Sequence, residues 1–425
     1  MVSDIAIIGS QYGDEGKGKI TYFFANRLYE SGEAEAVVKS QGGNNAGHTV
    51  IDPRGNVIRL HLLPSGILIP GMKNYVLSEV YVNPLEAMKE IRELESDFGI
   101  EITPDNFGIS GNCNVTLPYH LDRNAMEEEL IGKRVSTRRG IAQTASDKYG
   151  YYGIRIADFV DDSFPDILGD SLERNRRILA GCNISVPLEV QSYLDLLSEP
   201  RAFLKDFIIN EAEIRRNKSG GWVFEQNQGF MLSITYGPQP GNTASDPHRT
   251  AYPVDEKLAL MKLIPSRVGA APRIGVMDGP DADICRGKKG EIDSEFGATT
   301  GFARDVCYFD PIAITYAMSI IEPDKLVLTK ADKMRGVDHK MVVGYNTGEG
   351  IINQFPQERA LFEACSMHEP LLMDFPRTDE DICGLTEREK LPGEYKETFC
   401  MIEDALCRKI DYISTGPKKE HMIER

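Results

Sequence analysis

Short apolar runs alternate along the chain with polar loops rich in glycine. The clearest runs are Asp4–Gly9, Ala36–Val38, Asn74–Leu77, Gly221–Phe224 and Lys325–Leu328. Because they are short and bounded by turn-forming residues, these runs predict buried strands. Several are followed by loops rich in Gly, Asn, Thr and Asp, and open parallel sheets bind ligands at the carboxyl ends of their strands. These loops are therefore the first candidates for a functional site.

Longer segments between the runs have helical spacing. Ile20–Glu30 is apolar enough for a buried helix, and Pro84–Phe98 carries acidic and basic residues spaced for i,i+4 pairing. No internal repeat, low-complexity segment or long linker divides the sequence. We therefore expect an α/β fold, P-loop-like, with a mostly parallel central sheet, flanking helices and insertions, in a single large domain over residues 1–425.

Composition narrows the function classes. With 41% hydrophobic and 27% charged residues and a mean hydropathy of −0.30, the chain has the balance of an ordinary globular protein. A net charge of −17 argues against nucleic-acid partners, and the absence of a long apolar run argues against membrane partners. The eight cysteines are scattered without a CxxC pair, and the first residues lack the basic region of a signal peptide. We therefore expect a cytoplasmic location with reduced thiols.

The loop after the first predicted strand combines glycines with lysines. In GSQYGDEGKGK (residues 9–19), closely spaced glycines let backbone N–H groups approach an anion, and Lys17 and Lys19 add positive charge. The spacing differs from the standard P-loop, so the pattern alone also allows a structural turn. Asp14 inside this loop would repel a phosphate unless it binds Mg²⁺ or acts as a base, and a helix N-cap is the alternative role for it.

A second polar loop, QGGNNAGHT (residues 41–49), follows another apolar run. Its glycines and asparagines can present amide groups and backbone carbonyls to a ligand, together with the imidazole of His48. An isolated histidine is more often structural, but its place among glycines after a strand favours a functional role. The two loops together indicate phosphate binding with an acid and a base nearby.

The segments YGDEGKGK and QGGNNAGHT resemble the signature loops of the adenylosuccinate synthetase family. Further segments follow in that family's order: VSTRRGI at 135–141, FEQNQGFMLSITYG at 224–237, SRVGA at 266–270, FGATTG at 296–301, TKAD at 329–332 and STGPKKE at 414–420. The resemblance covers essentially the whole chain. It implies a homodimeric ligase of purine nucleotide biosynthesis that joins L-aspartate to C6 of IMP through a 6-phosphoryl intermediate, with GTP as phosphoryl donor and Mg²⁺ as cofactor.

The same resemblance assigns roles to individual residues. Asp14 would remove the N1 proton of the purine and would bind Mg²⁺ together with Gly47, while His48 would act as general acid and Lys17 would neutralise the transferring phosphoryl group. The residues implied in GTP binding are Gly13, Glu15, Gly16, Gly18, Lys19, Thr49, Arg304, Lys330, Asp332, Ser414, Thr415 and Gly416. Those implied in binding the purine nucleotide are Asn45, Ala46, Thr137, Arg138, Gln228 and Thr243, and those implied in binding aspartate are Thr299, Thr300 and Arg304.

Guanine recognition also follows from the chemistry of one side chain. The carboxylate of Asp332 can accept hydrogen bonds from both the N1–H and the 2-amino group of guanine, a pattern that adenine does not offer. The TKAD segment therefore favours GTP over ATP as the donor.

Two positions depart from the family's pattern. Tyr151 stands where the family places an arginine that reaches the partner subunit's nucleotide phosphate, and Arg138 is an extra cation that is a candidate to replace it. Phe302 replaces the first arginine of the aspartate-binding loop, whereas Arg304 is kept. These differences leave open a related reaction, the synthesis of 2-amino-2′-deoxyadenylosuccinate from dGMP. Retention of Asp14 favours IMP.

An alternative from another class is a non-catalytic, guanine-nucleotide-binding regulatory protein that keeps the scaffold. Loss of two arginines is consistent with decay of catalysis. Asp14, Lys17, His48 and Asp332 are all present, however, and neutral drift would rarely spare that set.

Overall fold

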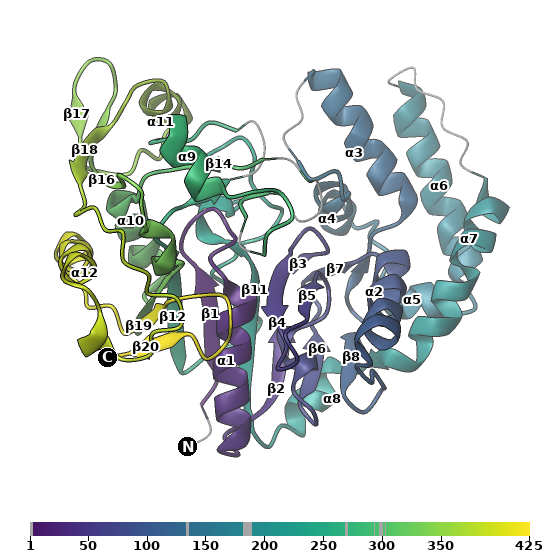
Figure 1. Ribbon diagram of the computed structural model, residues 1–425. Helices are drawn as coiled ribbons and strands as arrows, with labels where there is room; N and C mark the ends of the chain where they lie inside the picture. The colour runs from purple at the N-terminus through teal and green to yellow at the C-terminus, as the bar shows by residue number, and fades with distance from the viewer. Residues whose placement is uncertain are drawn as a thin grey trace.

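A large central sheet organises the molecule (Figure 1). The structure is a computed structural model that describes residues 3–132, 136–181, 189–267, 271–292, 294–296, 301 and 303–425. In sheet order the strands are β10 (Ile208–Ile209), β8 (Phe107–Ser110), β6 (Lys73–Val76), β2 (Ala34–Lys39), β11 (Gly221–Gly229), β1 (Ile5–Gly9), β12 (Glu256–Lys262), β15 (Lys325–Thr329), β19 (Tyr412–Ser414) and β20 (Met422–Glu424). Neighbouring strands are parallel except β19 and β20, which are antiparallel.

Smaller sheets extend from the central one. They contain β3 (Gly42–Gly43), β7 (Val80–Val82) and β9 (Asn114–Val115); the hairpin of β4 (His48–Ile51) and β5 (Val57–Leu60); β13 (Ser266–Arg267) and β14 (Asp305–Val306); and β16 (Lys340–Asn346), β17 (Ile351–Ile352) and β18 (Leu371–Asp374). The β4–β5 hairpin matters most for function, because it follows the second polar loop and packs on the first helix.

Helices flank the sheet, with α2 to α7 gathered at one end of it and α9 to α12 at the other (Figure 1). They are α1 (Lys17–Glu30), α2 (Pro84–Phe98), α3 (Pro118–Ile131), α4 (Ile141–Tyr149), α5 (Ile156–Val160), α6 (Phe164–Gly181), α7 (Val190–Leu204), α8 (Glu211–Arg216), α9 (Gly279–Arg286), α10 (Pro311–Ile321), α11 (Arg359–Ser366) and α12 (Gly393–Leu406). Short 3₁₀ turns lie at Ser65–Leu68, Lys205–Phe207, Phe230–Leu232, Ala331–Met334 and Arg388–Lys390. No helix among the described residues combines the length and apolar character needed to cross a bilayer.

Strand β1 shows why the sheet is buried on both faces. All five of its residues are buried, and successive side chains point to opposite faces. Ile5 and Ile7 join the apolar cluster that contains residues of α1, whereas Ala6 and Ile8 join the cluster that contains residues of α10. A parallel sheet covered on both faces explains the continuous apolar runs in the sequence.

The predicted α/β fold with a mostly parallel central sheet is confirmed. Each of the five predicted strand segments overlaps a strand of this sheet, and the predicted helix Pro84–Phe98 is α2 with the same bounds. The first helix begins at Lys17, earlier than the sequence pattern predicts. Because β1, β2, β11, β12, β15 and β19 are parallel, the loops after them leave the sheet at one edge. Both glycine-rich loops are among these loops.

Candidate active site

The loop between β1 and α1 is organised around the buried carboxylate of Glu15. This carboxylate accepts hydrogen bonds from the backbone N–H groups of Gln11 (3.1 Å) and Gly13 (2.9 Å), and Lys17 Nζ lies 2.5 Å from it. A Cβ atom on Gly9 would lie 2.3 Å from Glu15 Oε2, so the loop requires glycine there. Glu15, predicted in GTP binding, therefore directs its side chain into the loop.

Asp14 lies in this loop, and its side chain is about one-third exposed. Its φ is +59°, and the glycines on either side of it, Gly13 and Gly16, also have positive φ, so the backbone turns sharply here. The residue that precedes α1 is Gly16, so the N-cap role that the sequence allowed for Asp14 is wrong. Asp14 Oδ2 instead lies 3.0 Å from Arg304 Nη2.

A buried ionic network holds Arg304 in place. Glu295 lies 3.2 Å from Arg304 Nη1, 2.6 Å from Lys330 Nζ and 2.8 Å from Lys262 Nζ. Burial alone would raise the pKa of Glu295, but these cations hold it well below its usual range. Burial lowers the pKa of Lys262 to about 8. Burial disfavours the charge on Arg304, but Asp14 and Glu295 outweigh this and raise its pKa. Glu295 thus connects Lys330 of the TKAD segment, through Arg304, to the candidate base Asp14.

His48, the first residue of β4, pairs with Glu225 of β11 through Nδ1. Glu225 also accepts hydrogen bonds from the backbone N–H and the hydroxyl of Ser65, each at 2.6 Å. Burial opposes the charge on Glu225, yet His48 and Lys39 bring its pKa to about 2, so it is ionised and accepts a hydrogen bond from Nδ1–H of His48. Burial lowers the pKa of His48, and Glu225 partly offsets this. His48 Nε2 is buried without a hydrogen-bond partner in the described part of the chain.

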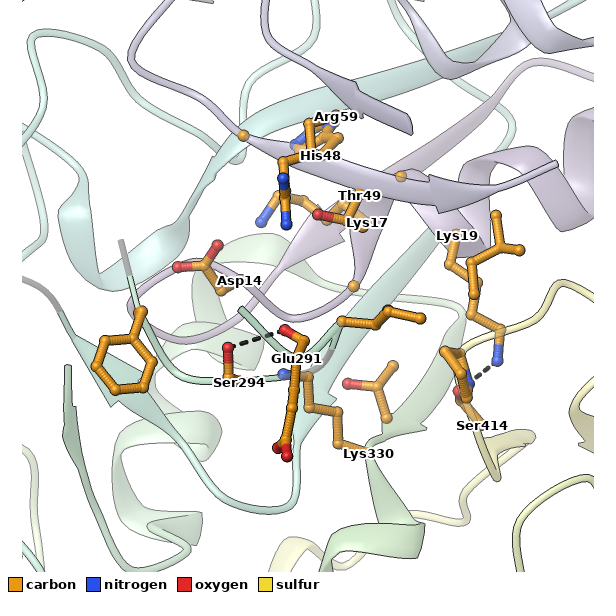
Figure 2. A pocket seen from close by; sticks show the side chains of 18 of the residues that line it. Asp14, Lys17, Lys19, His48, Thr49, Arg59, Glu291, Ser294, Lys330 and Ser414 are labelled. Carbon is orange, nitrogen blue, oxygen red and sulfur yellow. Dashed lines mark hydrogen bonds between the residues drawn. The ribbon is translucent and has the colours of Figure 1, made fainter. Parts of the chain in front are cut away.

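A first cavity, of about 310 Å³, gathers most of the residues predicted to bind GTP (Figure 2). Among those predicted, Gly16, Gly18, Lys19, Thr49, Arg304, Lys330, Asp332, Ser414 and Gly416 line it. Gly13 lines the second cavity, while Glu15 and Thr415 line neither. Lys19 Nζ donates to Ser414 Oγ and to the Gly416 carbonyl, both at 2.6 Å. This fixes the C-terminal loop against α1.

The second cavity, of about 180 Å³, gathers residues predicted to bind the purine nucleotide. Asn45, Ala46, Thr137, Gln228 and Thr243 all line it. Asn45 Oδ1 and Thr243 Oγ1 are buried without a hydrogen-bond partner among the described residues, as a site for a polar ligand requires.

Arg138, the other predicted member of the nucleotide-binding set, does not line the second cavity. Its Nε lies 2.6 Å from the carboxylate of Glu128. The neighbouring Arg139 lines the cavity instead and is 3.0 Å from Glu86. Arg138 has a positive φ of +56°, and of the two neighbouring arginines only Arg139 lines this cavity.

The two cavities share Asp14, Lys17, Gly47, His48 and Arg304. The three residues predicted to be catalytic, Asp14, Lys17 and His48, therefore all lie at the junction, the place where the two cavities meet. Gly47, whose backbone carbonyl is part of the predicted metal site, lies there too. A group bound in one cavity and a group bound in the other meet beside a carboxylate, an amine and an imidazole. This arrangement suits transfer of a phosphoryl group between two bound nucleotides.

Some predicted positions contribute differently or lie elsewhere. Thr299, Thr300 and Phe302 of the predicted aspartate loop lie outside the described residues. Tyr151 lines neither cavity and is 95% exposed.

Sequence reasoning missed several residues of the site. Arg59 and Lys289 line the first cavity, Arg267 lines the second, and Glu225 supports His48. Glu225 and Arg267 lie in segments that carry the family resemblance, 224–237 and 266–270, and Arg59 is marked as a cation between the apolar neighbours Ile58 and Leu60 of a strand.

Comparisons with known proteins point to one family. A model of the adenylosuccinate synthetase family matches residues 6–423. The adenylosuccinate synthetase of Desulforamulus reducens is 34% identical and aligns with 99% of this chain and 98% of its own length. That of Clostridium botulinum is 32% identical, with 99% of each chain aligned.

Two solved structures share the fold. The fully ligated adenylosuccinate synthetase of Plasmodium falciparum has a TM-score of 0.87 and 24% identity, with all of both chains covered. Succinoaminodeoxyadenylate synthetase of cyanophage S-2L, bound to dGMP and dATP, has a TM-score of 0.55 and 16% identity, with 100% of this chain and 96% of that chain covered. With the family model spanning nearly every residue, this chain belongs to the adenylosuccinate synthetase family.

Proposed function

We propose that the protein joins L-aspartate to C6 of IMP at the expense of GTP, releasing adenylosuccinate, GDP and phosphate. The observation that carries the proposal is the meeting of two cavities at Asp14, Lys17 and His48. GTP occupies the first cavity and IMP the second, so that O6 of the purine faces the γ-phosphoryl group.

The first step activates the purine oxygen. Asp14 accepts the N1 proton of IMP, O6 attacks the γ-phosphorus, and the bond from that phosphorus to the bridging oxygen breaks to release GDP. Arg304 orients the Asp14 carboxylate through the contact at 3.0 Å. In the second step the neutral amine of aspartate attacks C6, the C6–O6 bond breaks, phosphate leaves with the bonding electrons, and the nitrogen gives one proton to the departing phosphate. Phosphorylation is needed because an amide-like oxygen is otherwise a poor leaving group.

His48 and Lys17 stabilise the charge that moves during transfer. The buried Nε2 of His48 has no protein partner among the described residues, so it is available to donate a proton to an oxygen of the phosphoryl group. Glu225 orients the ring and favours its protonated form. Lys17, held by Glu15 at the start of α1, places a positive charge in both cavities. Such preorganised charge carries most of the catalysis of phosphoryl transfer.

The site also fits Mg²⁺. No cluster of three or more His, Cys, Asp or Glu side chains able to hold a metal occurs among the described residues. Mg²⁺ bound with a nucleotide needs only one or two carboxylates, because phosphate oxygens and waters complete its shell. The Asp14 carboxylate and the Gly47 carbonyl would supply the protein ligands. When bound, the ion neutralises negative charge on the donor phosphates.

Other features of the proposal follow from family membership and the first cavity. Asp332 lines that cavity and supports guanine over adenine in the donor. We also propose that the enzyme is a homodimer and acts in the cytoplasm. The resemblance to the cyanophage enzyme, which was solved with dGMP, keeps that nucleotide as a substrate to be tested.

The decisive experiment compares acceptors at fixed GTP, Mg²⁺ and aspartate. IMP, dIMP, GMP and dGMP are supplied one at a time, and succinyl-purine product, GDP and phosphate are measured. We expect product only with IMP and, more slowly, dIMP. Asp14→Asn is the negative control and should bind GTP yet release no GDP. GTP turnover without a succinyl-purine product from any acceptor would refute the proposal. Product from dGMP alone would show that the acceptor is dGMP and not IMP.

A further inference from the structure

Two cations that line the first cavity, Arg59 and Lys289, have no role in the mechanism above. Neither makes an ion pair or side-chain hydrogen bond in the part of the chain that the structure describes. The other four cations of the lining are held by the protein: Lys17 by Glu15, Arg304 and Lys330 by Glu295, and Lys19 by the C-terminal loop. Two uncompensated cations are notable in a chain with a net charge of −17.

The strand pattern directs Arg59 toward the cavity. Its neighbours Ile58 and Leu60 are fully buried, so Arg59 lies on the opposite face of β5. Across the hairpin it pairs with Thr49, and directly opposed residues of an antiparallel pair point to the same side. Thr49 lines the same cavity. Figure 2 shows Arg59 at the end of the cavity where His48, Thr49 and Lys17 lie, away from Lys330 and Ser414.

Lys289 reaches the cavity from a different element. It lies in the turn after α9, where the Glu291 carboxylate accepts a hydrogen bond from the Lys288 backbone N–H at 3.0 Å. Its Nζ lies 3.2 Å from the position that a Cβ on Gly301 would take, and Gly301 has a positive φ of +65°. A side chain at position 301 would therefore push the ammonium group of Lys289 aside, and glycine leaves room for it.

The charge balance of the lining identifies the ligand. Six cationic side chains face three acidic ones, Asp14, Glu291 and Asp332. Lys17, at the start of α1, marks the phosphate-binding end, and Arg59 lies at that same end. Guanidinium and ammonium groups are the usual side-chain partners of phosphate oxygens. A polyphosphate is the ligand of the proposed reaction that requires this excess of positive charge.

We propose that Arg59 and Lys289 bind the polyphosphate chain of the donor nucleotide, Arg59 from the β4–β5 hairpin and Lys289 from the turn after α9. The inference rests on the proposed function in taking GTP as the occupant of this cavity. Both residues are positioning residues of the donor. We expect them to act on binding of the donor, and among the described residues neither makes a hydrogen bond or ion pair with Asp14 or His48.

The test measures equilibrium binding of GTP, GDP and GMP, with Mg²⁺, to Arg59→Gln and Lys289→Gln. We expect each variant to lose about tenfold in affinity for GTP and GDP, the loss typical of one charge-assisted hydrogen bond. Affinity for GMP should change less than about twofold. In steady state, KM for GTP should rise in parallel, whereas kcat at saturating GTP and KM for aspartate should stay near the parent values.

Matched controls come from neighbouring positions. Arg54→Gln removes a cation in the turn of the same hairpin that pairs with Asp52 and lies outside the cavity lining. Lys288→Gln removes the adjacent lysine, which also lies outside it. Both should bind GTP normally, and thermal unfolding should show that all four variants are folded.

Three results would overturn the inference: unchanged GTP affinity in both test variants, equal losses for GTP and GMP, or a rise in KM for aspartate with GTP binding intact. The binding measurement needs no acceptor nucleotide. A protein that binds GTP but yields no product with any acceptor would therefore refute the proposed function and leave this test valid.

Discussion

The contact between His48 and Glu225 gives the imidazole both its orientation and part of its basicity. We expect Glu225→Gln to lower kcat by about a hundredfold, the scale of a general acid contribution. Burial lowers the pKa of His48 and the charge of Glu225 raises it, so removing that charge lowers the pKa further. Activity that needs protonated Nε2 falls as pH rises through this pKa. The descending limb of the kcat profile should therefore move to lower pH.

Glu90→Gln provides a control for the loss of a buried carboxylate. Glu90 accepts hydrogen bonds from the backbone N–H groups of His61, Leu62 and Leu63 and lines neither cavity. Glu90→Gln should lower the free energy of unfolding, but the descending limb of its kcat profile should lie at the same pH as that of the parent protein. If the descending limb of the kcat profile of Glu225→Gln lies at the same pH as in the parent protein, Glu225 has no part in the protonation of His48.

At the level of residues, the sequence could predict side chains that lie in loops with a recognisable pattern. Asp14, Lys17 and His48 belong to glycine-rich segments, and the structure brings all three to the junction. Glu225 lies within a strand, where a charged residue gives no sign of which loop it supports. Its partnership with His48 joins residues 177 positions apart, which only the folded sheet reveals.

At the level of elements, a buried ionic cluster ties α3, α4 and α6 together. Asp147 of α4 lies 2.9 Å from Arg123 of α3, 3.0 Å from Arg174 of α6 and 3.2 Å from His120 of α3. Burial would raise the pKa of Asp147, but hydrogen bonds from His120 and Arg123 outweigh it and hold that pKa well below the usual value. The cluster matters for function, because Asn124 of α3 and the first turn of α4 line the second cavity.

We expect Asp147→Asn to lower the free energy of unfolding by about 3 kcal/mol, because it leaves the buried Arg123 without its counter-charge. KM for the acceptor nucleotide should rise while KM for GTP stays unchanged. A carboxyl group with a depressed pKa contributes stability above its ordinary pKa and loses it as pH falls. The difference from the parent in urea unfolding should thus be constant near neutral pH and shrink below about pH 4.

The control for this cluster is Asp170→Asn, an exposed aspartate on the same helix as Arg174. It should unfold like the parent. Equal stability of Asp147→Asn and the parent at pH 7 would contradict the role of the cluster.

Elements were predictable where a single physical rule governs them. Strands buried on both faces give apolar runs, and α2 has Asn83 as a side-chain cap at its start and Gly99 in a left-handed conformation at its end. The order of the strands was not predictable, because β11 inserts between β1 and β2 after a long excursion of the chain. That insertion is what delivers Glu225 and Gln228 to the site.

At the level of the whole molecule, local and overall charge oppose each other. The chain carries −17, yet cations outnumber acidic groups in both cavity linings. Anionic substrates are therefore attracted only at short range, where screening by salt is weakest. From the composition one could predict that nucleic acids are not partners. The positive charge of the cavity linings could not be predicted, because it depends on which residues the fold places in the cavities.

The proposed homodimer gives the last prediction. Tyr149, Tyr151 and Tyr152, at the end of α4, are 69%, 95% and 54% exposed, and Tyr151 has a positive φ of +70°. Exposed aromatic clusters mark protein interfaces, where tyrosine is enriched. We expect Tyr151→Asp to raise the dissociation constant of the dimer at least about tenfold, because it buries a charge at the interface.

Sedimentation equilibrium over a range of concentrations measures this effect. Met367→Asp, which alters a residue 75% exposed just after α11, is the control and should dimerise like the parent. A parental protein that stays monomeric would refute the dimer, whereas an unaffected dimer in Tyr151→Asp would place the interface elsewhere. Because α4 also lines the second cavity, activity per chain should fall together with dimer content if the interface orders that helix. Full activity in the monomeric variant would show that each subunit holds a complete site.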